Sequence, residues 1–81
     1  MSKKYRMKKP YKFMVKVVVS EDYQGVGYEE IQKRYYTNRE DAQEYFGFKK
    51  SDFIIYNRPA LVVLYSYNFT ILDKYQNRWY N

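Results

Sequence analysis

The side chains with catalytic potential in this sequence are carboxylates and tyrosines, because the chain contains no histidine and no cysteine. The carboxylates include three adjacent pairs, Glu21-Asp22, Glu29-Glu30 and Glu40-Asp41. Acid–base catalysis needs groups that converge on one substrate atom, whereas such neighbours are typical of a solvated surface or a helix cap. The usual general bases and thiol nucleophiles are absent altogether. We therefore expect a protein that is not an enzyme.

Cofactor and metal sites find equally little support in the residue types. Without cysteine and histidine, the common zinc and haem sites are excluded. Gly25-Val26-Gly27 lacks the third glycine and the strand-to-helix setting of a dinucleotide fingerprint, so it predicts a turn. Any of the 12 tyrosines could in principle attack DNA, but such enzymes need a metal cluster or an Arg/His constellation to stabilise the transition state. We expect no cofactor and no metal.

The net charge of +6 is concentrated at the start of the chain. Residues 13–81 contain nine basic and nine acidic residues, so that part of the chain is formally neutral. A cationic arm of this kind attracts phosphates with strong salt dependence and little sequence preference, and Tyr5 and Tyr11 within it could stack on bases. The six cations of the arm are Lys3, Lys4, Arg6, Lys8, Lys9 and Lys12.

A second candidate for nucleic-acid contact lies in residues 38–56. This segment resembles a helix-turn-helix of the excisionase or MerR-like kind, with Gly47 at the turn and apolar residues at Ala42, Phe46, Phe48, Phe53 and Tyr56. The resemblance implies that Lys49, Lys50, Ser51 and Asp52 open a recognition helix that faces the major groove. Against it stands the segment 53–59, whose composition favours a strand followed by a turn.

Tyrosine density supports two functions at once. Twelve tyrosines and Trp79 cannot all be buried in 81 residues, so an exposed aromatic surface is expected. Such a surface suits base stacking, and it equally suits protein interfaces. We expect a nucleic-acid-associated accessory protein that uses the arm and this surface. The alternative is a protein-binding inhibitor or adaptor, because the small size and aromatic density resemble accessory proteins of phages and mobile elements.

The elements that must position these side chains begin with a strand. From Tyr11 to Ser20 apolar residues alternate with period two, which predicts a strand whose odd-numbered face is buried. Residues 21–27 predict a loop. Residues 28–36 fit a helix or a strand, and the strand is preferred because Tyr35-Tyr36-Thr37 has β propensity.

A short helix follows over residues 38–46. Thr37 and Glu40 form a Thr-x-x-Glu capping box, and Gly47 offers a stop. A helix of about eight residues is marginal alone, so its Tyr45 and Phe46 side must dock on the sheet.

The remainder of the chain favours strands. We expect strands at Phe53–Tyr56 and Ala60–Tyr67, with a chain reversal between them at Asn57-Arg58-Pro59. The last segment is expected to form a hairpin of residues 69–72 with 78–80. The alternative for this segment is a helix that aligns Leu72, Tyr75 and Trp79.

The predicted fold is α+β, an antiparallel sheet of four to five strands with one short helix packed on one face, in β-β-α-β-β order. Residues 1–10 form a flexible basic arm and residues 11–81 a single globular domain. No apolar run approaches the roughly 18 residues that span a membrane, so a cytoplasmic location is expected. Self-association into a homodimer would add support to a core of this size.

Overall fold

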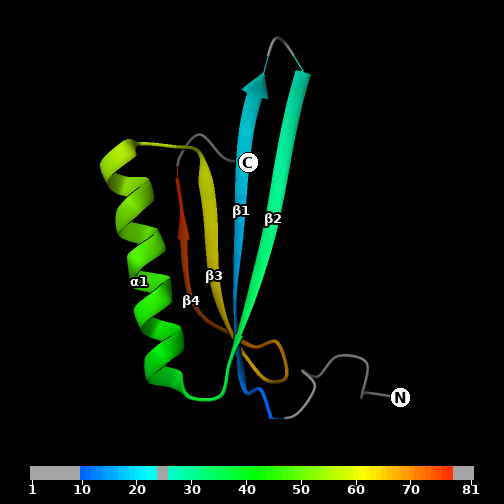
Figure 1. Cartoon of the computed structure of the whole chain (residues 1–81), viewed down its shortest axis with the longest axis vertical. Helices are drawn as coiled ribbons and strands as arrows, with labels where there is room; N and C mark the ends of the chain where they lie inside the picture. Colours follow the sequence, from blue (N-terminus) through cyan, green and yellow to red (C-terminus); the bar gives the residue numbers. More distant parts are fainter. Residues whose placement is uncertain (1–9, 24–25, 78–81) are drawn as a thin grey trace.

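The computed structural model describes residues 10–23 and 26–77. They form four strands and one helix: β1 (Phe13–Tyr23), β2 (Val26–Tyr36), α1 (Arg39–Tyr56), β3 (Ala60–Ser66) and β4 (Ile71–Gln76). All strand pairs are antiparallel and the sheet order is β2-β1-β3-β4, with α1 connecting β2 to β3 (Figure 1). The predicted α+β fold and its β-β-α-β-β order are therefore confirmed.

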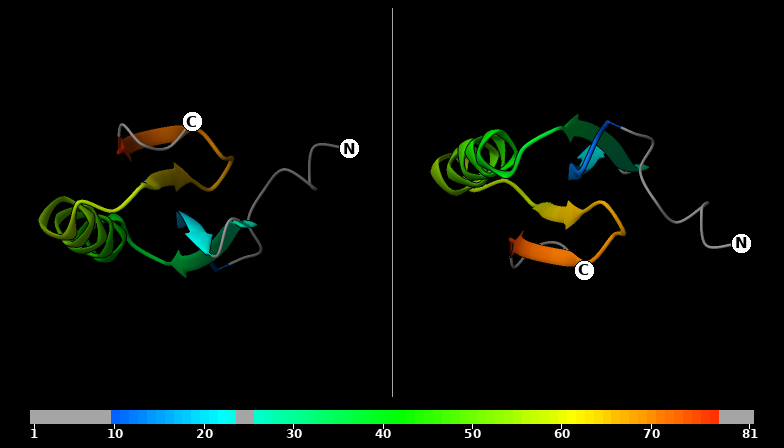
Figure 2. Two further views of the ribbon diagram at one scale, coloured as in Figure 1. Left: turned by 90° about the horizontal axis from the view of Figure 1, so that it is seen from above. Right: turned by 90° about the horizontal axis from the view of Figure 1, so that it is seen from below.

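The helix covers only one face of the sheet, and in the described part of the chain no element lies against the other face (Figure 2). The odd-numbered side of β1 faces α1, as its alternation predicts, and Val15 and Val17 are buried there. Val62 and Leu64 of β3 extend this surface, and Ala42, Phe46 and Phe53 of α1 pack onto it. One apolar cluster between the helix and two central strands thus forms the core on this side, and Met14, Val18 and Val63 are buried on the other face of the same strands.

The first hairpin is longer than expected. Residues 28–36 are a strand, as preferred, but β2 already begins at Val26 and β1 continues to Tyr23, so much of the predicted loop 21–27 belongs to paired strands. The pairing of β1 with β3 stops at Val19. Beyond that residue the β1–β2 hairpin therefore continues as a two-stranded extension (Figure 1).

The helix begins one residue later than the capping box predicts. Asn38 is the N-cap, and its Oδ1 accepts a hydrogen bond of 2.8 Å from the Asp41 backbone N–H. Its Nδ2 donates to Asp41 Oδ2 at 3.0 Å. The Asn38-x-x-Asp41 pair thus replaces Thr37 and Glu40 in the same capping role, because asparagine satisfies the free N–H groups at least as well as threonine.

The helix also runs ten residues beyond the predicted end, through Gly47 to Tyr56. Phe53 is buried on the same side as Phe46, and this burial outweighs the β propensity of Phe53–Tyr56. The predicted strand at 53–56 is therefore wrong. The helix-turn-helix is also wrong, because Gly47 lies inside one continuous helix and no turn separates two helices there.

The helix ends at Asn57, where the chain reverses as predicted. Asn57 adopts the left-handed region (φ 51°), its N–H donates to Ile54 O at 3.3 Å, and the Arg58 N–H donates to Phe53 O at 3.2 Å. This pair of bonds is a Schellman motif. Further along, the buried Asn77 Nδ2 donates to Arg58 O at 2.7 Å, which joins the end of β4 to the end of the helix.

The last hairpin differs from the predicted one. It joins β3 and β4, and residues 73–76 continue the strand instead of turning. Leu72 and Tyr75 pack against the core, and this packing holds the segment in the sheet. The pairing of β3 with β4 contains a register shift between Leu64 and Tyr65. The expected partner strand 78–80 lies outside the described residues, as do residues 1–9 of the basic arm.

Candidate functional site

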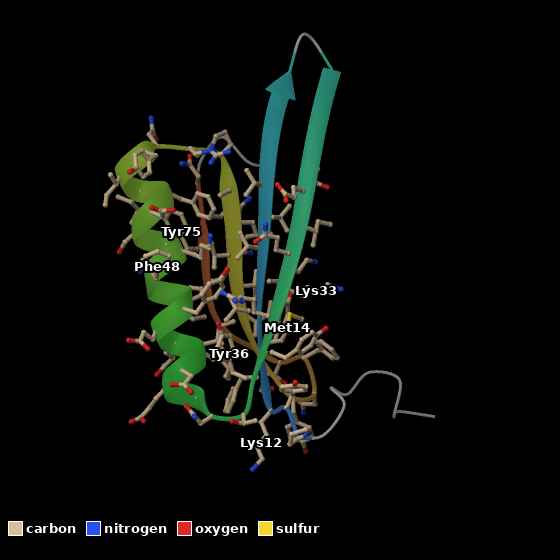
Figure 3. The ribbon with its side chains drawn as sticks, in the orientation of Figure 1. Lys12, Met14, Lys33, Tyr36, Phe48 and Tyr75 are labelled. Atoms are coloured by element: carbon tan, nitrogen blue, oxygen red, sulfur yellow. The ribbon has the colours of Figure 1, made fainter. Side chains whose placement is uncertain are left out.

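A row of lysines crosses the helix-free face of the sheet. In the strand pairing, Lys33 of β2 lies opposite Lys16 of β1, Lys16 opposite Val63 of β3, and Val63 opposite Lys74 of β4. Paired side chains on one face of a sheet have Cβ atoms about 5 Å apart. Lys33 points away from α1 (Figure 3). Three cations from three strands therefore lie in one row on the helix-free face.

An aromatic row lies next to the lysine row, toward the start of β1. It consists of Tyr35, Met14, Tyr65 and Ile71 in order across the sheet. Tyr11 packs on Tyr35 with ring centroids 5.7 Å apart, and Phe69 packs edge-on against Tyr65 at 5.9 Å. Met14 is only 3 % exposed and lies between the two tyrosines in this row. The two aromatic pairs thus flank a buried centre and remain partly open to solvent.

The third row, on the other side of the lysines, is formed by Ile31, Val18, Leu61 and Gln76. None of the twelve positions in these three rows is acidic; the first carboxylate on this side of β2 is Glu29, two residues before Ile31. We call these twelve positions, with Tyr11 and Phe69, the open face. It combines positive charge with exposed rings.

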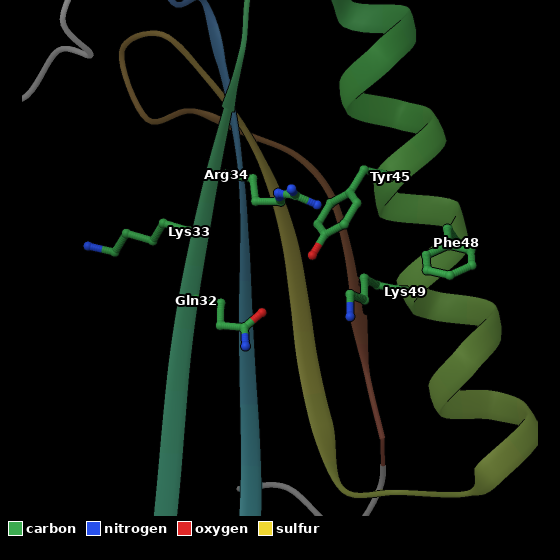
Figure 4. A pocket seen from close by; sticks show the side chains of 6 residues that line it. All are labelled: Gln32, Lys33, Arg34, Tyr45, Phe48 and Lys49. Carbon is green, nitrogen blue, oxygen red and sulfur yellow. The ribbon is translucent and has the colours of Figure 1, made fainter.

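A groove lies on the opposite side of the sheet, between α1 and β2. Arg34 and Tyr45 point toward each other across it, and Phe48 and Lys49 line its helical side (Figure 4). The Arg34 guanidinium carbon lies 4.8 Å from the centre of the Tyr45 ring, and Lys49 Nζ lies 5.8 Å from the same ring centre. Two cations from different elements therefore converge on one tyrosine.

The base of this groove near the start of the helix is aromatic. Tyr36 packs against Tyr45 with ring centroids 6.0 Å apart. Burial raises the pKa of the Tyr36 phenol above its ordinary value of 10.0, while Arg34 acts in the opposite direction. Asp41 and Glu44 line a neighbouring hollow beside Tyr36 and Tyr45.

Two of the adjacent carboxylate pairs, Glu29-Glu30 and Glu40-Asp41, have described side chains, and neither pair converges on one point. Glu29 and Glu30 are consecutive in β2 and so lie on opposite faces of the sheet, and Asp41 is engaged in the helix cap. Within residues 10–23 and 26–77, no group of three or more His, Cys, Asp or Glu side chains is arranged to hold a metal ion. In the same residues, no helix has the length and apolar character needed to cross a membrane.

The predicted nucleic-acid-binding residues are dispersed. Lys3, Lys4, Arg6, Lys8 and Lys9 lie outside the described residues. Lys12 is exposed just before β1, and its backbone N–H donates to Tyr36 O at 2.9 Å. Lys49 is half-buried in the groove and Lys50 is exposed, both in the middle of α1 instead of opening a recognition helix.

Sequence reasoning missed Lys16, Lys33 and Lys74. The signal that could have found them is strand parity, which places Lys16 opposite the buried side of β1 and puts Lys33 on the same side of β2 as Tyr35. Their alignment in one row depends on the pairing register, which a one-residue shift would have destroyed. Comparison of the chain with models of protein families, with curated proteins and with solved structures finds no match.

Proposed function

We propose that this protein is a non-enzymatic nucleic-acid-binding accessory protein whose open face holds a single strand. The observation that carries the proposal is the row Lys33–Lys16–Lys74 beside the row that contains Tyr35 and Tyr65. A single-stranded nucleic acid laid across the sheet would meet cations from three β-strands. With about 0.7 counterions released per phosphate, three such contacts give a slope of about −2 in log K against log salt.

The aromatic row supplies the second half of recognition. Exposed rings stack on unpaired bases, and each stacked base contributes about 1–3 kcal/mol with little sequence preference. Tyr11, Tyr35 and Phe69 are 41, 44 and 37 % exposed, so their rings are accessible. Because bases in a duplex are already stacked on each other, this surface favours single-stranded DNA or RNA over duplex.

The basic arm would add to the same binding. Tyr11, which directly follows the arm, contacts Tyr35 at the aromatic end of the open face. The cations of the arm therefore directly precede, in the sequence, the residues that begin this surface.

The test is fluorescence anisotropy with labelled single-stranded DNA, duplex DNA and RNA across a salt series. We compare the full chain, a chain beginning at Lys9, the triple variant Lys16→Gln/Lys33→Gln/Lys74→Gln, and Arg39→Gln as a control on the exposed start of α1. We expect single strands to bind best, with loss in the triple variant and no loss in Arg39→Gln. If the full chain binds no nucleic acid at low salt, the proposal is wrong.

The second candidate is a protein-binding inhibitor or adaptor of the phage or mobile-element kind. It is favoured by the exposed apolar residues of α1, because Phe48, Ile54, Ile55 and Tyr56 are 62, 53, 72 and 68 % exposed. Large exposed apolar patches are typical of protein interfaces. This function predicts that Ile55→Ser abolishes partner binding while loss of the arm or of Lys16 leaves it intact. The nucleic-acid function predicts the reverse.

A further inference from the structure

We infer that the groove between α1 and β2 is a second phosphate-binding site, reached by a single strand that continues from the open face over the edge strand β2. This inference rests on the proposed function and extends it to the other side of the sheet.

The groove has the charge of a phosphate site. Its lining residues Gln32, Lys33, Arg34, Tyr45, Phe48 and Lys49 include no carboxylate, and two of its cations, Arg34 and Lys49, point into it, whereas Lys33 points away from the helix. Arg34 and Lys49 lie over the same ring, at 4.8 Å and 5.8 Å from its centre. Both cations lie next to the same side chain, so a phosphate bound beside Tyr45 would be attracted by two positive charges.

The side chains match phosphate chemistry. The planar guanidinium of Arg34 can donate two parallel hydrogen bonds to phosphate oxygens, and the ammonium of Lys49 supplies a compact charge beside it. Phe48 at the rim is 62 % exposed and offers a ring to the adjoining base.

The acidic side chains nearby set the limits of the site. Glu30 accepts a hydrogen bond of 3.2 Å from Gln32, on the side of the groove away from Arg34. Asp41 and Glu44 line the neighbouring hollow, which shares Tyr45 and Phe48 with the groove, and they are not among the residues that line the groove itself. The phosphate position is therefore confined to the space between Arg34 and Lys49.

The edge strand connects this groove with the open face. Among the described residues, β2 has a sheet neighbour only on its β1 side, and its successive residues Lys33 and Arg34 present one cation to each face. Lys33 belongs to the lysine row and also lines the groove, and Figure 4 shows it pointing away from the helix while Arg34 points toward Tyr45. A nucleic-acid strand that crosses over β2 would thus remain in contact with cations along its whole path.

The experiment measures the binding of labelled oligothymidylates of about 4 and about 12 nucleotides, spanning the site sizes of single-strand-binding surfaces, across a salt series. For Arg34→Gln/Lys49→Gln we expect the slope for the long oligomer to fall by about 1.4, and its affinity near 0.1 M salt to fall roughly 25-fold. The short oligomer should be unaffected. Arg39→Gln, which removes an arginine outside the groove, should leave both oligomers unaffected.

Each of the other outcomes shows whether the groove inference, the proposed function or both are wrong. If the groove variant binds the long oligomer normally while Lys16→Gln/Lys33→Gln/Lys74→Gln loses it, the groove inference is wrong and the proposed function stands. If neither variant loses affinity, both are wrong. If thymidine 5′-monophosphate alone binds tightly and Arg34→Gln/Lys49→Gln abolishes that binding, the ligand is a free nucleotide and the path over β2 is wrong.

Discussion

Lys16 of β1 and Lys33 of β2 lie directly opposite each other on the helix-free face of the sheet. Like charges in this position oppose strand pairing, and no acidic residue of the row offsets them. The anionic partner that we propose would offset this repulsion when it is bound. The pair therefore links the stability of the fold to the proposed function.

The first prediction follows from this pair. Lys33→Glu replaces repulsion by attraction, so the free energy of unfolding should rise by about 0.5–1 kcal/mol at low salt. Urea unfolding measures the change, which should shrink as salt is added. Lys33→Gln should give a smaller gain, and both variants should bind single strands more weakly. A loss of stability in Lys33→Glu would contradict the interpretation.

The second prediction concerns Gly47 in the middle of α1. A Cβ atom added there meets nothing within 4 Å, so the glycine is not required by packing within the chain. Gly47→Ala should raise the free energy of unfolding by about 0.5–1 kcal/mol, because alanine loses less conformational entropy in a helix. Thermal unfolding checks this. A lower melting temperature would show that helix α1 needs glycine at this position.

The third prediction concerns the left-handed residue that ends the helix. Asn57 has φ 51°, a conformation that costs most residues with a Cβ about 1–2 kcal/mol and glycine almost nothing. Asn57→Ala should therefore destabilise the protein by about 1 kcal/mol, while Asn57→Gly should be neutral or slightly stabilising. Urea unfolding of the two variants side by side is the measurement, and equal effects would argue against the Schellman motif.

The fourth prediction tests the contact between the end of β4 and the end of α1. Asn77 is 6 % exposed and donates to Arg58 O at 2.7 Å. Asn77→Ala removes this donor from a partly buried carbonyl and should cost about 1–3 kcal/mol. Asn77→Asp should be no better, because an ionised carboxylate cannot donate. Hydrogen exchange should show faster opening at the C-terminal end of α1 in both variants.

The fifth prediction is a pH dependence. Burial raises the pKa of Tyr36 above 10.0, so the neutral phenol is favoured in the folded state. The corresponding stability is fully present below the unfolded pKa and is lost as the pH rises through the folded pKa. Between about pH 9 and about pH 11, Tyr36→Phe should therefore lose less stability than the wild type. Urea unfolding at the two pH values tests this, and identical losses would contradict it.

Local sequence signals determined most of the element order. Alternation around Val15 and Val17 specified β1, and the acidic residues after Thr37 marked the start of a helix to within one residue. The absence of histidine and cysteine limited the possible chemistry through residue type alone. These properties depend on composition and on neighbouring residues, which is why the sequence was sufficient for them.

The length of α1 and the layout of charge were decided by tertiary structure. Phe53–Tyr56 has β propensity, but Phe53 is helical because the sheet offers it a buried position in line with Phe46. By sequence, residues 13–81 are neutral, yet strand pairing gathers Lys16, Lys33 and Lys74 in one row without acids. Register and helix packing join residues far apart in the chain, and their combined effect is not encoded in any local pattern.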